Sequence, residues 1–443
     1  MTGNKQHETG KVKTMKKLLQ VLGKIRTPFV AAASVLALVL GVTAPLQAKA
    51  ANEITFVSPA WIPGTVTAIK DAITAWNKAN PNTPVKLIPG DWDSLGDQLT
   101  TQFASKTAPD VIMFDSISIR DYAKRGYLAD LTSLMRPLQS QIPVGEWKAS
   151  SYNGRLVGVP FLDQTYVVFA NVDMFKKAGV AIPTNPGGIT WDEFAALAKK
   201  MTTPTSYGLT YGLLKPASSF MIMSSNFGAQ WFRGYTTGRA SLRVTQSELE
   251  VPLRVYDMVY KDKSIDPASL TISAGASLAP FLAGKTSMLL MGSYAASDLD
   301  VAAKEKGFNW TVLPLLKGTS QGQGANPQTF SINALSTKKK DAARFIQFLM
   351  QGKYLSKIAL GDGLVPLTSD ALKAGIEAKK DSPGWSQIFS DGGNFTLAPF
   401  AFVPEFAQWK STVLQPSLQQ FIQNKITKEE LVKRLEDGWK NLR

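Results

Sequence analysis

Aromatic side chains in this sequence fall in predicted loops and at the ends of predicted elements, rather than on apolar helical stripes. Seven residues share this placement: Trp61, Trp92, Phe114, Trp147, Trp231, Tyr294 and Trp409. Polar side chains accompany them: Asp115, Ser116, Ser118, Asp163, Gln164, Asn226, Asn326 and Gln408. A pyranose has an apolar C–H face that stacks on an aromatic ring, and hydroxyls that need partners when buried. The two sets together predict a sugar-binding cleft, although core packing explains any single aromatic residue equally well.

The residue types that the chain lacks exclude several kinds of catalysis. The 443 residues contain no cysteine, and the one histidine is His7. This composition excludes thiol catalysis, disulfides, Cys or His metal sites and triads built on imidazole. A carbohydrate-acting enzyme would need two carboxylates about 5 to 9.5 Å apart. Asp115 and Asp163 are the pair to test for that role, and we expect no turnover of a bound glycan.

Three patterns resemble phosphate or metal sites, and their spacing argues against each. The G-K-T at 284–286 ends like a P-loop, but Ala279 stands where the first glycine belongs, and a helix precedes the segment where a strand is required. The G-D-G at 361–363 lacks the third glycine of a dinucleotide fingerprint. The aspartate pairs at 91/93 and 298/300 lack the Gly and Glu of an EF-hand loop. We therefore expect no cofactor and no metal ion.

The first 50 residues have the pattern of a leader followed by an export signal. From Met15 a basic segment precedes an uncharged, largely apolar run at 29–42, and Ala48-Lys49-Ala50 fits the small-x-small cleavage rule. The apolar run of about 14 residues is short against the ~20 that a membrane-spanning helix needs. We expect cleavage after Ala50 and a periplasmic or otherwise extracytoplasmic product. A lipoprotein would need a cysteine at the cleavage point, so we expect no lipid anchor.

The basic charge of the chain is concentrated in this leader. The formal net charge is +15, but residues 1–50 hold eight Lys/Arg and one Glu, which leaves 41 basic against 33 acidic residues in the rest. Those charges are scattered, and the densest cluster, at 338–340, precedes a predicted helix. We read that cluster as a solvated turn and expect no nucleic-acid partner.

Predicted strands and helices alternate from residue 52 onward, and these elements must position the loop residues. The first strands and helices are 54–57, 65–80, 85–88, 94–106, 110–114 and 119–125. A second run begins near residue 164 with elements at 166–170, 172–178, 250–262, 274–282, 287–291 and 310–313. The C-terminal part is mainly helical, at 341–350, 404–423 and 428–442, and Thr190 with Glu193 and Thr427 with Glu430 form predicted capping boxes. This order predicts mostly parallel sheets with helices on both faces.

Four motifs follow one another between residues 107 and 288. The first is T-A-P-D-V-I at 107–112 with Y-A-K-R-G-Y-L-A-D-L-T at 122–132. The others are Y-N-G-R-L-V-G-V-P at 152–160, F-K-K-A-G at 175–179 with T-W-D-E-F at 190–194, and F-L-A-G-K-T-S-M at 281–288. In this order they closely resemble the motifs of the extracellular solute-binding proteins of carbohydrate-uptake ABC transporters, the family that includes maltose-binding protein. The resemblance spans roughly residues 52 to 370, and the C-terminal helices match in pattern.

The resemblance implies an α/β, two-lobed periplasmic binding protein fold of type II-like topology, in which each lobe is a mostly parallel sheet flanked by helices. The chain of such a fold crosses between the lobes three times, and we place the crossings near 161–164, 326–329 and 364–367. The N-terminal lobe then combines 52–161 with 329–364. The C-terminal lobe combines 164–326 with 366–443.

The resemblance also implies which side chains contact the sugar. By position these are Phe114, Asp115, Ser116, Ser118, Asp163, Gln164, Tyr294, Phe406, Gln408 and Trp409, with Trp61 and Trp231 aligned more loosely. Trp92 and Asn326 complete the predicted site from the aromatic and polar sets above. The maltose-type site has a carboxylate where this chain has Gln164, which argues against maltose itself.

The function implied by the resemblance is capture of a sugar or oligosaccharide and its delivery, in the closed form, to the permease subunits of an ABC importer by a monomeric protein. A ligand that touches both lobes shifts the population toward the closed form. The alternative is the same fold binding glycerol 3-phosphate, a glycerol phosphodiester or a polyamine. Phosphate would call for Arg or Lys in the cleft loops and a polyamine for several carboxylates, and the predicted loops show little of either.

Overall fold

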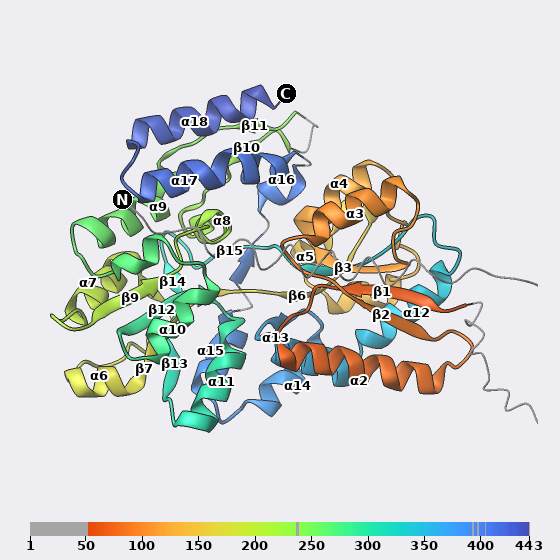
Figure 1. Cartoon of the computed structure of the whole chain (residues 1–443), viewed down its shortest axis with the longest axis horizontal. Coiled ribbons are helices and arrows are strands. Elements are labelled where there is room, and N and C mark those ends of the chain that lie inside the picture. The colour runs from red at the N-terminus through yellow and green to blue at the C-terminus, as the bar shows by residue number, and fades with distance from the viewer. Residues whose placement is uncertain (1–51, 236–238, 392–393, 397, 404, 443) are drawn as a thin grey trace, which may run out of the picture. The chain divides into compact units, whose positions relative to one another are not determined.

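The computed structural model describes residues 52–442 except 236–238, 392–393, 397 and 404. The predicted leader and export signal, at 1–50, lie outside the described residues. In the described part, no helix combines the length and the apolar character that crossing a membrane requires. Two β-sheets organise this part of the chain, as Figure 1 shows.

The first sheet has six strands in the order β17-β6-β16-β3-β1-β2. Its strands are β1 (Ile54–Ser58), β2 (Val85–Pro89), β3 (Val111–Asp115), β6 (Val159–Asp163), β16 (Gln328–Ile332) and β17 (Val365–Pro366). Strand β1 runs parallel to β2 and β3, whereas β16 is antiparallel to β3 and β6, and β17 is antiparallel to β6. Gln328, at the start of β16, pairs with Asp115 at the end of β3, so β16 enters the sheet at the edge where β3 leaves it.

The second sheet has four strands in the order β13-β7-β12-β9. They are β7 (Tyr166–Asn171), β9 (Tyr207–Tyr211), β12 (Thr286–Gly292) and β13 (Trp310–Val312). Only β12 and β9 are parallel, and β7 is antiparallel to both β12 and β13. The expectation of mostly parallel sheets is therefore wrong, since both sheets are mixed. A strand that enters a sheet from the edge where its neighbour leaves must run against that neighbour.

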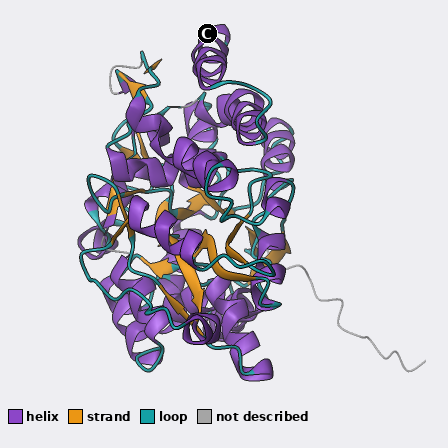
Figure 2. Cartoon of the chain, turned by 90° about the vertical axis from the view of Figure 1, so that its left-hand side faces the viewer, coloured by secondary structure: helices purple, strands orange, loops and turns teal. Residues whose placement is uncertain are grey.

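Both faces of each sheet are buried, as α/β architecture requires. In β7, Val168 and Ala170 belong to one hydrophobic core, and Val167 and Phe169 belong to the core on the opposite face. In the six-stranded sheet, Phe56 and Val57 divide in the same way. Figure 2 shows helices on the outside of the strands.

The helices divide between the two sheets according to the cores that they enter. Those on the six-stranded sheet include α2 (Pro63–Ala79), α3 (Leu95–Ala104), α4 (Ser116–Lys124), α5 (Val144–Ala149), α12 (Lys339–Leu349) and α13 (Gly352–Asp362). Those on the four-stranded sheet include α6 (Val172–Ala178), α7 (Trp191–Lys200), α8 (Ala217–Ser224), α9 (Gln246–Tyr260), α10 (Leu278–Leu282), α11 (Ala295–Lys306), α15 (Pro383–Asp391), α16 (Phe406–Trp409), α17 (Gln415–Ile422) and α18 (Lys428–Asn441). Helix α14 (Ser369–Ala378) packs on α13 and α15.

Four short two-stranded β-ladders, with two residues in each strand, lie in the loops between these elements. They are β4 (Ser151–Tyr152) with β5 (Arg155–Leu156), β8 (Ile189–Thr190) with β14 (Leu316–Lys317), β10 (Phe232–Arg233) with β11 (Ser241–Leu242), and β15 (Gln323–Gly324) with β18 (Phe395–Thr396). The β15/β18 ladder joins segments more than 70 residues apart in the sequence.

The chain passes directly from one sheet to the other after β6. Only Gln164 and Thr165 separate β6, in the six-stranded sheet, from β7, in the four-stranded sheet. It returns between β13 and β16, and the segment after β17 leads to helices α15 to α18, which bury their apolar residues against the four-stranded sheet. The two sheets are thus linked through backbone segments that lie close together at Asp163 and Asn326.

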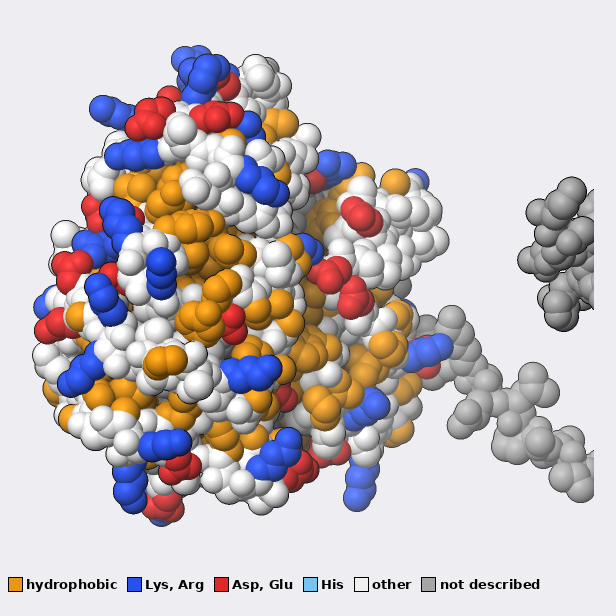
Figure 3. Space-filling model, turned by 60° about the vertical axis from the view of Figure 1, so that its left-hand side comes forward, with side chains coloured by type: hydrophobic (Ala, Val, Ile, Leu, Met, Phe, Trp, Pro, Cys, Tyr) orange, Lys and Arg blue, Asp and Glu red, His pale blue; other side chains and the backbone are white. Residues whose placement is uncertain are grey.

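Basic and acidic side chains mix on the surface. On the face that Figure 3 shows, Lys and Arg lie interspersed with Asp and Glu, and no single sign covers that face. Elsewhere among the described residues, several charges form i,i+3 or i,i+4 pairs within one helix, such as Lys433 with Asp437 on α18. Nucleic-acid binding requires a continuous basic patch, and this face carries none.

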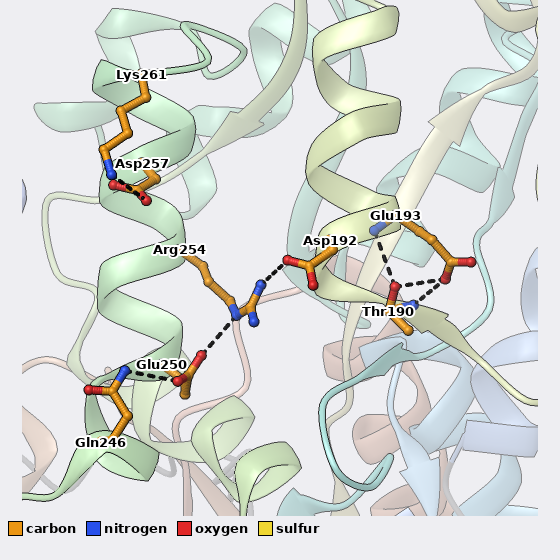
Figure 4. Close-up of polar contacts among 8 residues, drawn as sticks. All are labelled: Thr190, Asp192, Glu193, Gln246, Glu250, Arg254, Asp257 and Lys261. Atoms are coloured by element: carbon orange, nitrogen blue, oxygen red, sulfur yellow. Dashed lines mark hydrogen bonds and ion pairs between the residues drawn. The ribbon is translucent and has the colours of Figure 1, made fainter.

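Polar contacts at the start of α7 and between α7 and α9 fix these two helices of the four-stranded sheet, as Figure 4 shows. Thr190 and Glu193 form the expected capping box at the start of α7, with the Glu193 carboxylate accepting from the Thr190 N–H at 2.8 Å. Arg254 on α9 donates to Asp192 on α7 and to Glu250 one turn earlier on its own helix. The guanidinium therefore fastens two helices that are about 60 residues apart in the sequence.

The C-terminal helices differ from the expected ones. The helix predicted over 404–423 is divided into α16, a π-helical segment at Lys410–Leu414, and α17. Pro416 lies just after that segment, and its missing N–H cannot continue an α-helical ladder. At α18 the Thr427 hydroxyl accepts from the Glu430 N–H, but the Glu430 carboxylate pairs with Arg434 instead of completing a capping box.

Candidate ligand-binding site

A cavity of about 540 Å³ lies between loops that belong to the two sheets. Its lining residues are Trp61, Ile62, Trp92, Asp115, Ile117, Ser118, Gln164, Gly275, Tyr294, Asn326, Gln328, Asp362, Leu364, Ala407, Lys410 and Ser411. Six of them end or follow the parallel strands β1, β2 and β3, because the carboxyl ends of neighbouring parallel strands meet at one edge of a sheet: Trp61, Ile62, Trp92, Asp115, Ile117 and Ser118. Others follow β12 or come from the C-terminal helices of the four-stranded sheet, so both halves of the fold build the cavity.

Seven of the fourteen residues predicted from the sequence line this cavity. They are Trp61, Trp92, Asp115, Ser118, Gln164, Tyr294 and Asn326. The lining thus combines aromatic rings with amides, a hydroxyl and a carboxylate, the mixture that a polyhydroxylated ligand with apolar faces requires.

Three aromatic rings in the cavity differ in how firmly they are held. Trp61 has 59% of its surface exposed and is among the most exposed large apolar residues described. Trp92 is partly buried and stacks on Phe114 with ring centroids 5.6 Å apart. Phe114, a predicted ligand residue, therefore supports Trp92 from behind and does not line the cavity. The Trp61 ring is therefore exposed to a ligand, and the Trp92 ring is held in its orientation by packing on Phe114.

The Tyr294 ring lies directly over the backbone of Gly292, two residues earlier. A Cβ atom at position 292 would lie 2.3 Å from Tyr294 Cε1, so only glycine leaves room for the ring in this position. Burial raises the pKa of Tyr294 to about 12. The ring contacts both a core of the six-stranded sheet and one of the four-stranded sheet, while its exposed edge lines the cavity.

Two further predicted residues lie behind the cavity and hold its loops. Ser116 is buried, and its hydroxyl donates to the Asn326 side-chain oxygen at 3.3 Å. Asp163 is 1% exposed and accepts from the backbone N–H groups of Gln164, at 2.7 Å, and Asn326, at 3.0 Å. Because Gln164 and Asn326 lie on different crossing segments, the Asp163 carboxylate joins those segments. It does not reach the ligand space, so an enzymatic pair with Asp115 is not formed in the cavity.

Three predicted aromatic ligand residues belong to the core of the four-stranded sheet, which corrects the expectation. Trp231, Phe406 and Trp409 are each 1% exposed or less. The indole N–H of Trp231 donates to Ser224 and that of Trp409 to the Leu435 carbonyl, so their polar atoms are also satisfied inside the protein. Such side chains have no surface to offer a ligand.

The remaining residues of the aromatic and polar sets do not line the cavity. Gln408 is exposed but lies outside the cavity lining. Its backbone carbonyl accepts from the hydroxyl groups of Ser411 and Thr412. Trp147 packs on the core of the six-stranded sheet. Asn226 is buried and accepts from the Trp191 indole N–H at 3.2 Å.

Sequence reasoning missed two charged residues of the cavity. Asp362 lies in the G-D-G segment at 361–363, which suggested only an incomplete nucleotide fingerprint, and it accepts from Thr65 Oγ1 and Gln328 Nε2, both at 3.1 Å. Burial raises the pKa of Asp362 to about 6. Lys410 enters the cavity from the π-helical segment, and no local sequence signal marks it.

The two halves of the fold also touch beside the cavity, through helix α4. Lys124 Nζ lies 2.9 Å from Glu405 Oε1, just before α16. One turn earlier on α4, the Arg120 guanidinium lies 4.7 Å from the Phe402 ring centroid and donates to the carbonyls of Ala149 and Ser151. Burial lowers the pKa of Arg120 to about 10. Helix α4 therefore lines the cavity at its start, with Ile117 and Ser118. Further along the helix, Arg120 and Lys124 contact the other half of the fold.

The site has the features of a binding site. In the part of the chain that the structure describes, no group of three or more acidic or histidine side chains is placed to hold a metal ion. The cavity is formed by loops from two sheets linked by short backbone segments, with aromatic rings and hydrogen-bonding groups on its walls. This fold and site define a solute-binding protein.

Comparison with known proteins shows the family. The family model described as bacterial extracellular solute-binding protein matches residues 61–351, and the chain belongs to that family. It is 34% identical over 402 residues, covering 90% of this chain and 88% of the relative, to an uncharacterized lipoprotein in the oleD 5' region of Streptomyces antibioticus. It is also 26% identical over 204 residues, or 45% of each chain, to an arabinooligosaccharide-binding protein of Bacillus subtilis (strain 168).

A solved structure shows the same fold. An ABC substrate-binding protein from Listeria monocytogenes, in complex with cycloalternan, superposes with a TM-score of 0.74 at 22% identity, over 88% of this chain and 98% of that one. The expected periplasmic binding protein fold is thereby confirmed. The protein is a bacterial extracellular solute-binding protein, and this family binds solutes and is not enzymatic.

Proposed function

We propose that this protein captures a sugar or oligosaccharide in the cavity between its two sheets and, closed around it, delivers it to the membrane subunits of an ABC importer. The observation that carries the proposal is the wall formed by Trp61, Trp92 and Tyr294 next to the polar groups of Gln164 and Asn326. Aromatic faces match the C–H faces of a sugar, and amides match its hydroxyls. The relative from Bacillus subtilis, named for arabino-oligosaccharides, supports the same ligand class.

In this proposal, closure of the two lobes around the ligand is what the membrane subunits of the importer recognise. We assign 52–161 with 329–364 to one lobe and 164–326 with 366–443 to the other, and the membership of the strands in the two sheets supports this division. A ligand held by both lobes binds the closed form better and shifts the population toward it. An affinity on the order of micromolar, about −8 kcal/mol, allows both capture and release.

The proposed mature form is a monomer that starts after Ala50 and carries no lipid. The export pattern at 1–50 and the absence of cysteine from the 443 residues support this form, although the relative from Streptomyces antibioticus is named a lipoprotein. Expression with its own leader in a bacterial host, followed by intact-mass measurement of the exported protein, tests it. A mass that begins at residue 51 supports the proposal, and a lipid-modified or uncleaved product contradicts it.

A thermal-shift screen against neutral pentose and hexose oligosaccharides tests the proposed ligand class. A ligand at 100 times its dissociation constant adds about 2.7 kcal/mol to the free energy of unfolding, which a melting curve resolves. Small-angle scattering with the best ligand should then show a smaller radius of gyration without a change in secondary structure. No shift with any sugar would contradict sugar binding, and an unchanged radius at saturation would contradict closure.

A further inference from the structure

Lys410 is a charged side chain in the cavity for which the described protein provides no partner. It begins the π-helical segment Lys410–Leu414 and lines the cavity together with its neighbour Ser411. Among the described residues, it makes no hydrogen bond and no ion pair through Nζ. Burial lowers the pKa of Lys410, and the opposite charge of Asp115 counteracts part of that effect. π-Helical turns are frequent at functional sites, because the wider turn redirects side chains.

Asp115 faces the same cavity from the other half of the fold. It precedes α4 as its N-cap, and its carboxylate accepts from the N–H groups of Ile117 at 3.1 Å and Ser118 at 3.0 Å and from the Ser118 hydroxyl at 2.6 Å. A carboxylate offers about four acceptor positions. Asp115 thus keeps acceptor capacity toward the cavity, and it does not form a direct ion pair with Lys410, so the two charges leave space between them.

We propose that Lys410 and Asp115 bracket one hydroxyl group of an uncharged saccharide, which accepts a hydrogen bond from Lys410 Nζ and donates one to the Asp115 carboxylate. This inference rests on the proposed function and specifies its ligand. A hydroxyl is both a donor and an acceptor, so it satisfies both flanking groups at once. Since Asp115 and Lys410 belong to different halves of the fold, the same hydroxyl links the halves.

The opposed charges also determine what the space rejects. A carboxylate or phosphate near Lys410 would lie beside Asp115, and an ammonium near Asp115 would lie beside Lys410. Asp362, the other carboxylate of the cavity, is already engaged by Thr65 and Gln328. Each charged substituent therefore meets a like charge across the space, while a neutral hydroxyl meets none. The proposal thus excludes acidic sugars, phosphodiesters and polyamines as preferred ligands.

Two substitutions and a matched control test the bracket. Lys410→Met removes the ammonium and keeps the length of the side chain, while Asp115→Asn removes the charge and keeps an N-cap residue. Lys425→Met removes one charge from an exposed lysine that does not line the cavity. Calorimetric titration uses arabinotriose and maltotriose as neutral probes, digalacturonate as the acidic probe and the glucosamine disaccharide as the basic probe.

We expect the wild type to bind a neutral probe more tightly than either charged one. Lys410→Met should weaken that binding at least tenfold, because hydrogen bonds to charged groups contribute about 1.5–3 kcal/mol, or roughly 10- to 150-fold. Lys425→Met should stay within about twofold of the wild type. The two cavity variants should be non-additive when combined, because they act on the same hydroxyl. The melting temperature of ligand-free Lys410→Met should not fall, and Lys410→Gln replaces it if that variant does not fold.

Each other outcome has a defined meaning. Neutral binding that Lys410→Met leaves unchanged overturns the bracket and leaves the proposed function standing. Tighter binding of digalacturonate, lost in Lys410→Met, shows that the lysine pairs with an acidic substituent and also overturns it. Preference for the glucosamine disaccharide overturns it as well. A failure of every saccharide to bind overturns the proposed function, and the bracket with it.

Discussion

Glu146 and Asp163 bury their carboxyl groups near each other, next to the segment where the chain first passes between the two sheets. Both side chains are 1% exposed. Among the described residues, neither oxygen of Glu146 has a hydrogen-bond partner, whereas Asp163 accepts from two backbone N–H groups. Burial raises the pKa of Glu146, and the nearby Asp163 raises it further; burial also raises the pKa of Asp163, but the two N–H groups that donate to Asp163 lower it. Glu146, which lacks donors, is therefore the group that holds a proton.

This buried pair predicts that stability falls as the pH rises. The folded protein binds more protons here than the unfolded chain, whose carboxyl pKa values are about 4. The stabilisation is therefore complete below about pH 4 and is lost as the pH rises from there toward the raised pKa of Glu146, at about 1.4 kcal/mol per pH unit for each extra proton. Glu146→Gln should flatten this decline and raise the melting temperature at pH 8 relative to the wild type. Melting curves between pH 5 and 8 check it, with the exposed Glu305→Gln as control; equal slopes in all three proteins would refute the assignment.

Tyr294 is expected to contribute to both ligand binding and packing. Tyr294→Ala should weaken sugar binding by about 1–3 kcal/mol, the range known for stacking on aromatic rings. Its stability cost should stay below the roughly 3–5 kcal/mol of a fully buried aromatic residue, because one edge of the ring faces the cavity. Titration and thermal melting of the same protein separate the two effects. Tyr294→Phe, which keeps the ring, is the control, and a large drop in melting temperature with unchanged affinity would remove Tyr294 from the site.

Trp61 should affect binding without affecting folding. It is 59% exposed at the cavity, and Leu335 is similarly exposed, at 60%, outside the cavity lining. Trp61→Ala should lower the affinity by about 1–3 kcal/mol and leave the melting temperature nearly unchanged. Leu335→Ala should change neither quantity. Equal affinity in the two variants would show that the exposed indole does not contact the ligand.

Trp409 should behave in the opposite way. It is fully buried, and its ring lies edge-on to Phe232 with centroids 5.4 Å apart. Trp409→Phe or Trp409→Ala should therefore lower stability, by about 3–5 kcal/mol for the alanine variant. Chemical denaturation measures that loss, and titration of the folded fraction should show nearly wild-type affinity. A variant with normal stability and lost binding would return Trp409 to the ligand site.

The Lys124–Glu405 ion pair should favour the closed form modestly. It joins α4 of one half of the fold to the residue before α16 of the other, and both side chains are partly exposed. Exposed pairs contribute about 0.2–1 kcal/mol, so Lys124→Met should weaken ligand binding by no more than about fivefold, and less at high salt. Lys433→Met, which breaks a pair within α18, is the control. A difference from wild type that persists at 0.5 M salt would argue against an electrostatic latch.

Local signals in the sequence were sufficient to predict several elements and part of the site. The helix expected over 172–178 has those bounds in the structure, and Thr190 caps α7 as its spacing with Glu193 indicates. Caps depend on atoms within one turn, so the sequence specifies them without help from the rest of the fold. The positions of Trp92 and Asp115, just after or at the ends of predicted strands, likewise indicated the edge at which parallel strands place their loops.

Long-range packing decided the rest. Trp61 and Trp409 carry the same side chain in regions predicted as loops or element ends, yet one is exposed at the cavity and the other is buried against helices from the C-terminal segment. Asp362 and Lys410 lie in one cavity with Asp115, although each of them is roughly 250 to 300 residues from Asp115 in the chain. Whether a ring is core or ligand wall, and which charges face each other, depends on contacts between distant segments. Those contacts exist only once both sheets have formed and the chain has crossed between them.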